Sequence, residues 1–164
     1  MAWRKHLLAV WLLAAVACSK EKPAPVSAAA PPAEHVSSPV GTNQAVLQKT
    51  FALKHSAEFQ FEIPAHAVTP HLHGIFESFV GQVHGASDES ANIDFLILNE
   101  EQHAEFAANR PSEAMFSVEA SHNQAINFDL PAAMSQPVKY YLVFRNGDGN
   151  KSSKVVEANF RVDF

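Results

Sequence analysis

From Ala45 onward, most of the chain alternates between apolar and polar residues with a period of two. In one such run, Phe59, Phe61 and Ile63 fall on one face, and acids and an amide fall on the other. The last run, residues 154–164, alternates without a break from Val156 onward. Successive side chains of an extended strand point to opposite faces, so this pattern predicts β-strands with one buried face.

Eight segments carry this alternation or a short apolar run, and turn-forming residues separate them. Prolines fall between these segments or at their ends, where a missing N–H does not interrupt a strand ladder. We therefore expect an all-β fold, a single antiparallel β-sandwich that resembles a jelly roll. Residues 99–109 combine an Asn at the N-cap position with acids and alanines, which predicts a short helix or turn. The predicted strands are 46–54, 57–63, 71–83, 91–98, 114–119, 124–129, 138–145 and 154–163.

The first seventeen residues have the pattern of an export signal. Arg4 and Lys5 precede an uninterrupted apolar run, residues 7–17, that ends in small residues. A helix that spans a bilayer needs roughly 20 apolar residues, and this run stops short of that length. The sequence therefore predicts a signal peptide at residues 1–17 that is removed, in place of a retained transmembrane helix.

Cys18, the only cysteine of the chain, directly follows these small residues. Residues 1–19 resemble the lipobox region of bacterial lipoproteins, with Ala15 where that family usually has Leu. The resemblance implies that Cys18 is lipidated and becomes the first mature residue, held in the membrane by several acyl chains. In the sorting rule of enterobacterial lipoproteins, Asp directly after the cysteine marks the inner membrane. Ser19 stands at that position here, so the resemblance implies sorting to the outer membrane. The alternative is an ordinary A-x-A cleavage site, which would leave a soluble periplasmic protein with a free Cys18.

Residues 18–44 lead from this anchor to the rest of the chain. Residues 19–44 hold five Pro, five Ala and four Ser among 26 positions, so they lack the apolar surface that a packed core requires. We expect a tether there and one sandwich domain at residues 45–164. Beyond the signal peptide the chain has ten basic and seventeen acidic residues, and no cluster of Lys and Arg. This balance excludes nucleic acid as a partner.

The order of the predicted strands resembles the β-sandwich domains of the pre-peptidase C-terminal class and the GOLD-type domains. The residues that carry the resemblance are FEIP at 61–64, LHGIF at 72–76, IDFLIL at 93–98, YYLVF at 140–144 and the last strand. Such domains are generally binding modules without catalytic activity. The resemblance therefore implies a class of domain and transfers no site residue.

Histidines supply the candidate metal ligands. His71 and His73 are two positions apart in a predicted strand, so their imidazoles project from one face and can converge on Zn²⁺ or Cu²⁺. His66, in the preceding loop, is the candidate third ligand, and His84 and Glu77 are further candidates. The alternative interpretation is that these are exposed polar residues on the outer face of a strand.

Other chemistry has weaker support in the sequence. Residues 87–90 and 146–150 offer oxygen ligands for Ca²⁺, but hairpin turns require the same Asn-Gly and Asp-Gly pairs and neither segment follows the EF-hand pattern. No nucleophile elbow, zincin helix or phosphate-binding glycine loop occurs.

Sugar-binding platforms need exposed aromatic rings. Tyr140 and Tyr141 point to opposite faces of a strand, so one is predicted in the core and one at the surface.

These observations lead to two hypotheses. The first is a non-enzymatic outer-membrane lipoprotein whose tethered β-sandwich binds or supports another envelope protein. The alternative is a periplasm-facing Zn or Cu binding protein that uses His71 and His73. Neither hypothesis assigns a catalytic residue or an obligatory cofactor to the chain.

Overall fold

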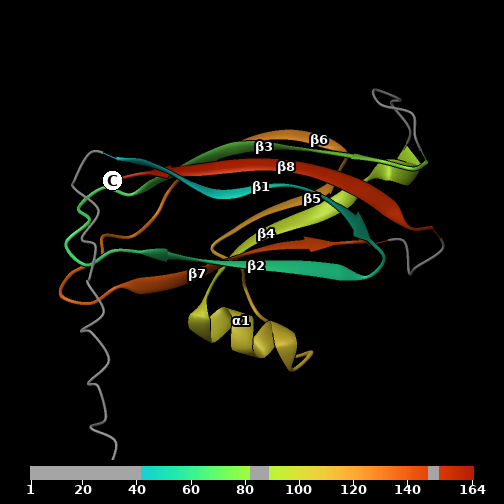
Figure 1. The fold of residues 1–164 in the computed structure, drawn as a ribbon. Coiled ribbons are helices and arrows are strands. Elements are labelled where there is room, and N and C mark those ends of the chain that lie inside the picture. Colours follow the sequence, from blue (N-terminus) through green and yellow to red (C-terminus); the bar gives the residue numbers. More distant parts are fainter. Residues whose placement is uncertain (1–41, 82–88, 148–151) are drawn as a thin grey trace, which may run out of the picture. The chain divides into compact units, whose positions relative to one another are not determined.

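The computed structural model describes residues 42–81, 89–147 and 152–164. Eight strands form two antiparallel four-stranded sheets packed face to face (Figure 1). This confirms the predicted β-sandwich. The predicted signal peptide, Cys18 and the tether up to residue 41 lie outside the described residues. The strands are β1 (Asn43–Leu53), β2 (Ser56–Ile63), β3 (His71–Phe79), β4 (Ile93–Asn99), β5 (Phe116–Ser121), β6 (Asn123–Asp129), β7 (Val138–Arg145) and β8 (Lys154–Asp163).

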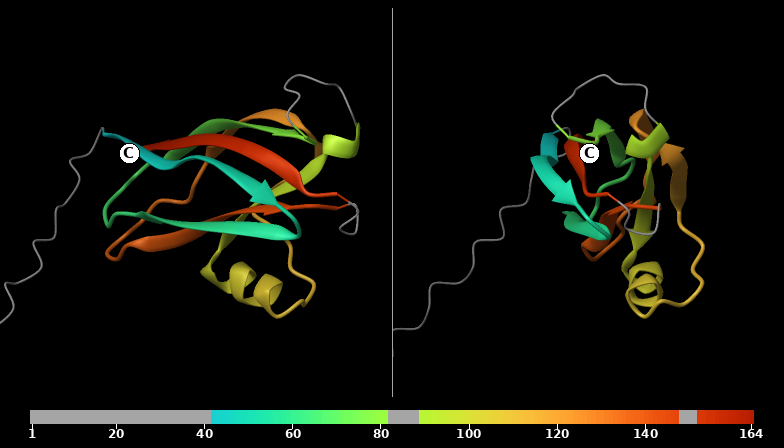
Figure 2. Two further views of the ribbon diagram at one scale, coloured as in Figure 1. Left: turned by 45° about the vertical axis from the view of Figure 1, so that its right-hand side comes forward. Right: turned by 90° about the vertical axis from the view of Figure 1, so that its right-hand side faces the viewer.

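The strand order is β1-β8-β3-β6 in one sheet and β2-β7-β4-β5 in the other. Every connection except that between β4 and β5 passes from one sheet to the other, which is the arrangement of an eight-stranded jelly roll. The two views of Figure 2 show the sheets edge-on and along the strands. Because the strands run along the sandwich, its loops gather at its two ends, and those ends carry most of the side chains discussed below.

Phenylalanine dominates the core between the sheets. Phe76 and Phe160 enter from the first sheet, Phe95 and Phe144 enter from the second, and all four side chains are fully buried. The ring centroids of Phe95 and Phe160 lie 5.2 Å apart in a stacked arrangement, and the Phe76 and Phe144 rings meet edge to face at 5.9 Å. These contacts join the two sheets across the core.

The structure corrects several predicted strand boundaries. β1 begins at Asn43, two residues before the predicted start of the domain, while β7 and β8 match the prediction. The strand predicted at 71–83 ends at Phe79, and its last two predicted positions lie outside the described residues. Ala91 belongs to a short 3₁₀ helix, Glu89–Ala91, so β4 starts only at Ile93. Ala114 and Met115 precede β5, which begins at Phe116.

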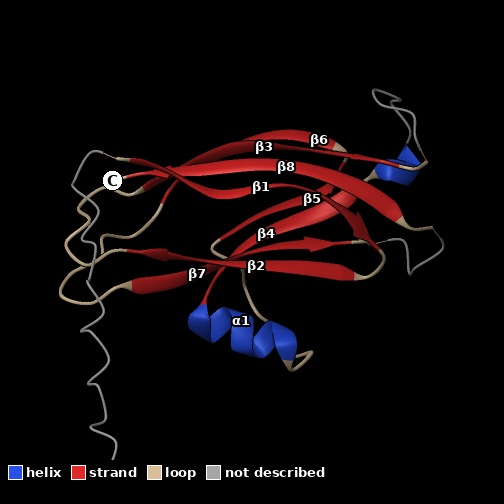
Figure 3. Cartoon of the chain, in the orientation of Figure 1, coloured by secondary structure: helices blue, strands red, loops and turns tan. Residues whose placement is uncertain are grey.

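The helix predicted within residues 99–109 is α1 (Glu100–Ala107), shown with the other elements in Figure 3. Asn99 is its N-cap: the Asn99 side chain accepts from the Gln102 N–H, and the Gln102 side chain accepts from the Asn99 N–H. Helices in the described ranges are too short and too polar to cross a membrane.

Candidate functional site

The outer surface of the β1-β8-β3-β6 sheet is the first candidate, and we call it the polar face. Residues directly opposite one another form rows across the sheet. Asp129, His71, Asp163 and Asn43 form the row at one end. Two further rows follow along the strands, and a row of Asn123, Glu77, Glu157 and Thr50 lies farther along the sheet. The alternating pattern of β3 and β8 places these side chains outside, because their neighbours fill the core.

His71 and His73 lie side by side on the polar face, as the sequence predicted. Their rings are parallel, with centroids 6.0 Å apart. Each imidazole already has a carboxylate partner: His71 Nδ1 is 2.7 Å from Asp129 Oδ1, and His73 Nε2 is 3.3 Å from Asp163 Oδ2. The pair is therefore held by the neighbouring strands, and a metal ion would have to compete with both carboxylates.

His66 does not join this pair through any contact in the described part of the chain. Its φ is +68°, and its N–H donates to the Met134 carbonyl at 2.8 Å in the loop between β6 and β7. Glu77 lies at the other end of β3 from His71, and His84 is outside the described residues. Among the residues that the structure describes, no group of three or more His, Cys, Asp or Glu side chains is placed to hold a metal ion.

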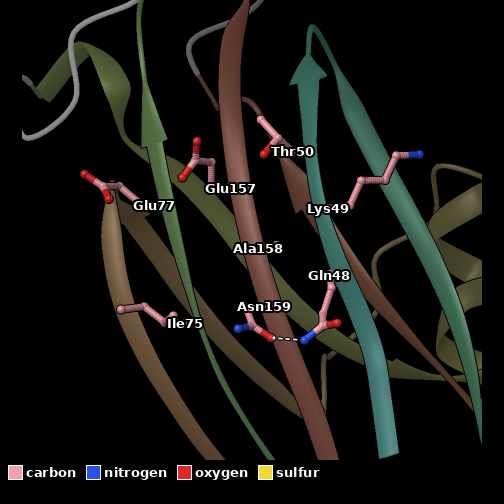
Figure 4. A pocket seen from close by; sticks show the side chains of 8 residues that line it. All are labelled: Gln48, Lys49, Thr50, Ile75, Glu77, Glu157, Ala158 and Asn159. Carbon is pink, nitrogen blue, oxygen red and sulfur yellow. Dashed lines mark hydrogen bonds between the residues drawn. The ribbon is translucent and has the colours of Figure 1, made fainter.

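The polar face also carries a hollow of about 440 Å³ (Figure 4). Ile75, 47% exposed, lies on one side, and Gln48 and Asn159 are joined on the other by a 3.2 Å hydrogen bond. Glu77 and Glu157 stand directly opposite each other on β3 and β8. Like charges in this arrangement repel, so the hollow favours a cationic or hydrogen-bonding contact over an anionic one.

A second hollow, at one end of the sandwich, is apolar. It has a volume of about 370 Å³ and lies between the β2–β3 loop and the β6–β7 loop. Val68 is 72% exposed and Met134 is 77% exposed, the two largest values among the exposed large hydrophobic side chains of the described residues. We call this the loop-end hollow. Its lining residues are His66, Ala67, Val68, Ala132, Ala133, Met134 and Ser135.

Backbone hydrogen bonds hold the two loops of this hollow together. The Ala133 N–H donates to the Ala67 carbonyl at 2.9 Å, and the Leu130 N–H donates to the Pro70 carbonyl at 2.9 Å. With the bond from His66, three hydrogen bonds cross between the loops. Sequence reasoning missed this site. Its only signal was a pair of short loops, each bounded by two prolines and rich in Ala and other apolar residues.

The two candidate Ca²⁺ loops have structural roles where they are described. Asn146 is buried, and its side-chain amide donates to the carbonyls of Lys54 at 3.2 Å and Ser152 at 2.8 Å. These bonds tie the β7–β8 connection to the β1–β2 turn. Glu89 and Ser90 begin the 3₁₀ helix. Residues 87–88 and 148–150 lie outside the described residues.

Helix α1 covers part of the outer surface of the other sheet. The His103 ring of α1 stacks on Tyr141 of β7 with centroids 3.6 Å apart, and His103 Nε2 is 2.8 Å from Glu58 Oε2. Tyr140 is 3% exposed, and its burial raises its pKa above the ordinary value of 10.0. Tyr140 therefore lies in the core, and Tyr141, predicted at the surface, is on the outer side of β7 but only partly exposed, because His103 covers it. The His103 ring of α1 covers one face of the Tyr141 ring, which a sugar-binding site would need to be exposed.

Comparisons with known proteins do not place this chain in a family. The chain matches no protein-family model, and no curated protein matches it significantly.

Proposed function

We propose that this chain is a non-enzymatic envelope lipoprotein whose tethered β-sandwich binds another envelope protein through the loop-end hollow. The observation that carries the proposal is the exposure of Val68 and Met134, at 72% and 77%, around an apolar hollow. Large aliphatic side chains that gather at a surface hollow are typical of contact sites for other proteins.

The chemistry of the hollow suits a protein partner. Burying apolar surface contributes about 25 cal/mol per Å², so covering two exposed aliphatic side chains favours association. The three hydrogen bonds between the loops fix the hollow before binding, which lowers the entropy lost on association. Met134 adds a flexible, polarisable side chain that adapts to the shape of a partner.

The position of the hollow agrees with a tethered domain. β1 starts at Asn43, which lies opposite Asp163 in the row that also contains His71 and Asp129. The β2–β3 loop ends at His71 and the β6–β7 loop starts after Asp129, so the start of β1 and the two loops lie at one end of the sandwich (Figure 1). The hollow between these loops therefore lies at that end as well. The lipobox resemblance at Cys18 and the Pro-rich segment after it supply the proposed anchor and tether.

The test is co-purification from chemically cross-linked envelopes of cells that make the full chain. Val68→Glu and Met134→Glu each place a charge in the hollow and are expected to remove the partner. Ile75→Glu is the matched control, because Ile75 is an exposed aliphatic residue on the polar face. A partner retained by the hollow variants, or lost equally in the control, would contradict the proposal.

A metal-binding protein is the second candidate function. The parallel imidazoles of His71 and His73, 6.0 Å apart, are the observation that favours it. Two imidazoles from one strand can share a Zn²⁺ or Cu²⁺ ion. This candidate requires binding of one metal ion per chain that is lost when both histidines are replaced.

A further inference from the structure

A third hollow lies at the opposite end of β2 from the loop-end hollow. Its volume is about 630 Å³, and it is bounded by the β1–β2 turn, the start of β4, the end of β7 and the C-terminal end of α1. Two arginines, Arg110 and Arg145, line it together with the ring of Phe106. We call it the arginine hollow.

Arg145 is held in place by Asp94. Its Nε and Nη2 donate to Asp94 Oδ2 at 3.0 and 2.9 Å. The other carboxylate oxygen, Oδ1, accepts from the Ala120 N–H at 3.1 Å. The Asp94 side chain is only 15% exposed, whereas that of Arg145 is 50% exposed. Both oxygens of the Asp94 carboxylate therefore already accept hydrogen bonds within the domain. The Arg145 side chain is held in one position at the wall of the hollow.

Arg110 brings a positive charge that no carboxylate of the described residues balances. No Asp or Glu side chain in the described ranges lies within ion-pair distance of it. The end of α1 fixes its position, because the Arg110 N–H donates to the Glu105 carbonyl at 2.9 Å. Asn109 before it takes a φ of +52°, a conformation that Asn tolerates better than most residues.

This positive hollow occurs in an acidic domain. Residues 45–164 hold eight Lys or Arg and fifteen Asp or Glu, an excess of seven negative charges. Such a domain is repelled by an anionic lipid surface, so a charged membrane is a poor ligand for it. A single carboxylate that enters the hollow meets Arg110, which can bind it with two hydrogen bonds. Phe106, half-buried at the wall, supplies an apolar contact for a neighbouring side chain.

We propose that the arginine hollow binds a carboxylate of an acidic protein segment in which apolar residues flank the acid. The juxtaposition of the unbalanced Arg110, the preorganised Arg145 and the Phe106 ring carries this inference. The site lies at the other end of the sandwich from the loop-end hollow, so it adds a second contact surface to the domain. With two contact surfaces at opposite ends, the domain can bind two protein segments at the same time.

The test uses the full chain in detergent and a fluorescent peptide that carries one Glu flanked by Leu residues, and binding is followed by fluorescence anisotropy. A matched peptide carries Gln in place of Glu. We expect saturable binding of the Glu peptide and binding at least about tenfold weaker for the Gln peptide. Arg110→Gln should weaken binding of the Glu peptide by a similar factor, and Arg110→Lys by less, because Lys keeps the charge but loses the bidentate geometry.

Lys139→Gln is the control, because Lys139 is a partly exposed cation that faces Glu100 at 3.7 Å away from the hollow. It should leave the affinity unchanged. Three results would overturn the proposal: no saturable binding, equal binding of the Gln peptide, or an equal loss in Lys139→Gln. Binding of anionic vesicles that depends on Arg110 would instead assign the hollow to lipid and would also overturn it. Val68→Glu changes only the loop-end hollow and should leave peptide binding intact. A negative result at one hollow therefore does not decide the proposal for the other.

Discussion

At the scale of single residues, Gly74 shows how closely two neighbouring strands of one sheet pack in this protein. It lies on the inner side of β3, opposite Phe160 of β8 and Ile126 of β6. A Cβ at this position would lie 2.6 Å from the Phe160 ring and would also overlap the Asn159 carbonyl oxygen. The Phe160 ring, stacked on Phe95, therefore covers the space that a side chain would occupy.

We predict that Gly74→Ala lowers the free energy of unfolding by about 1–3 kcal/mol, because the extra methyl group forces the backbone or the Phe160 ring to move. Urea unfolding of the full chain measures this loss. Gly147→Ala is the control, since a Cβ there would make only ordinary contact, 3.5 Å from Asp94. Equal losses in the two variants would show that the overlap at Gly74 has no energetic consequence.

Tyr140 links the core to the pH dependence of stability. Burial raises its pKa in the folded protein, so the unfolded chain loses the phenolic proton at a lower pH than the folded protein does. The contribution to stability is complete below pH 10 and falls as the pH rises from 10 through the folded-state pKa. Tyr140→Phe should flatten this alkaline loss in unfolding experiments. An unchanged alkaline slope in the variant would refute the assignment.

At the scale of elements, the period-two pattern was sufficient to find the strands but not their ends. β7 and β8 could be predicted fully, because turn-forming residues lie on both sides of β7 and alternation runs without a break through β8 from Val156 onward. β3 was predicted too long, because Ser78 and Phe79 are followed by Val80, which continues the apolar pattern after the strand has ended. Alternation reports which side chains are buried, and it does not report where pairing with a neighbour stops.

Helix α1 rests on the sandwich without any buried residue of its own. Its stability therefore depends on the capping box at Asn99 and on the stacking of His103 on Tyr141. We predict that Asn99→Ala costs about 1 kcal/mol and mainly frays the helix. Hydrogen exchange of the α1 amides should accelerate while that of β7 stays slow. Asn127→Ala, at an exposed Asn of β6, is the control, and acceleration in both variants would contradict a local effect.

The spacing of His71 and His73 predicted that they share one face of a strand, and the structure places their rings side by side. Residues two positions apart in a strand point to the same face, so the local sequence alone is enough to place His71 and His73 together. The position of His66 depends on how a loop folds, and that loop pairs with Met134 of a segment far along the chain. The two hollows at the ends of the sandwich are assembled from such distant segments, so they could not be predicted from spacing.

We predict that the full chain binds zinc and copper weakly and without a defined stoichiometry. His71 and His73 each face a carboxylate, and no third ligand lies with them in the described ranges. Calorimetric titration should give the same weak signal for the full chain and for the His71→Ala, His73→Ala double variant. Sub-micromolar binding of one ion per chain, lost in the double variant, would favour the metal-binding function instead.

At the scale of the whole molecule, the jelly roll places the three candidate surfaces at different positions along its strands. The loop-end hollow lies where β2 ends, the arginine hollow lies where β2 begins, and the polar face lies between the two ends on the outer side of one sheet. Such a domain can contact different groups at its two ends. The β-sandwich could be predicted from the sequence, but the strand order that creates these ends could not, because it depends on pairing between distant strands.

The proposed anchor makes a separate prediction about the whole chain. Mass spectrometry of the protein from envelopes should find Cys18 as the first residue, with acyl chains attached. Cys18→Ser should remove the lipid and release the protein from the membrane fraction, because the remaining chain has no other proposed anchor. A mature protein that begins at an unmodified Cys18 would support the alternative of a soluble periplasmic protein.

The most direct test of the central claim is a photo-activated cross-linker placed at Met134 of the full chain in living cells. We predict one reproducible protein adduct, which disappears when Val68→Glu is introduced into the same chain. The same cross-linker at Ile75 on the polar face should not form that adduct. The absence of an adduct at Met134, or the same adduct from Ile75, would contradict a partner that binds at the loop-end hollow.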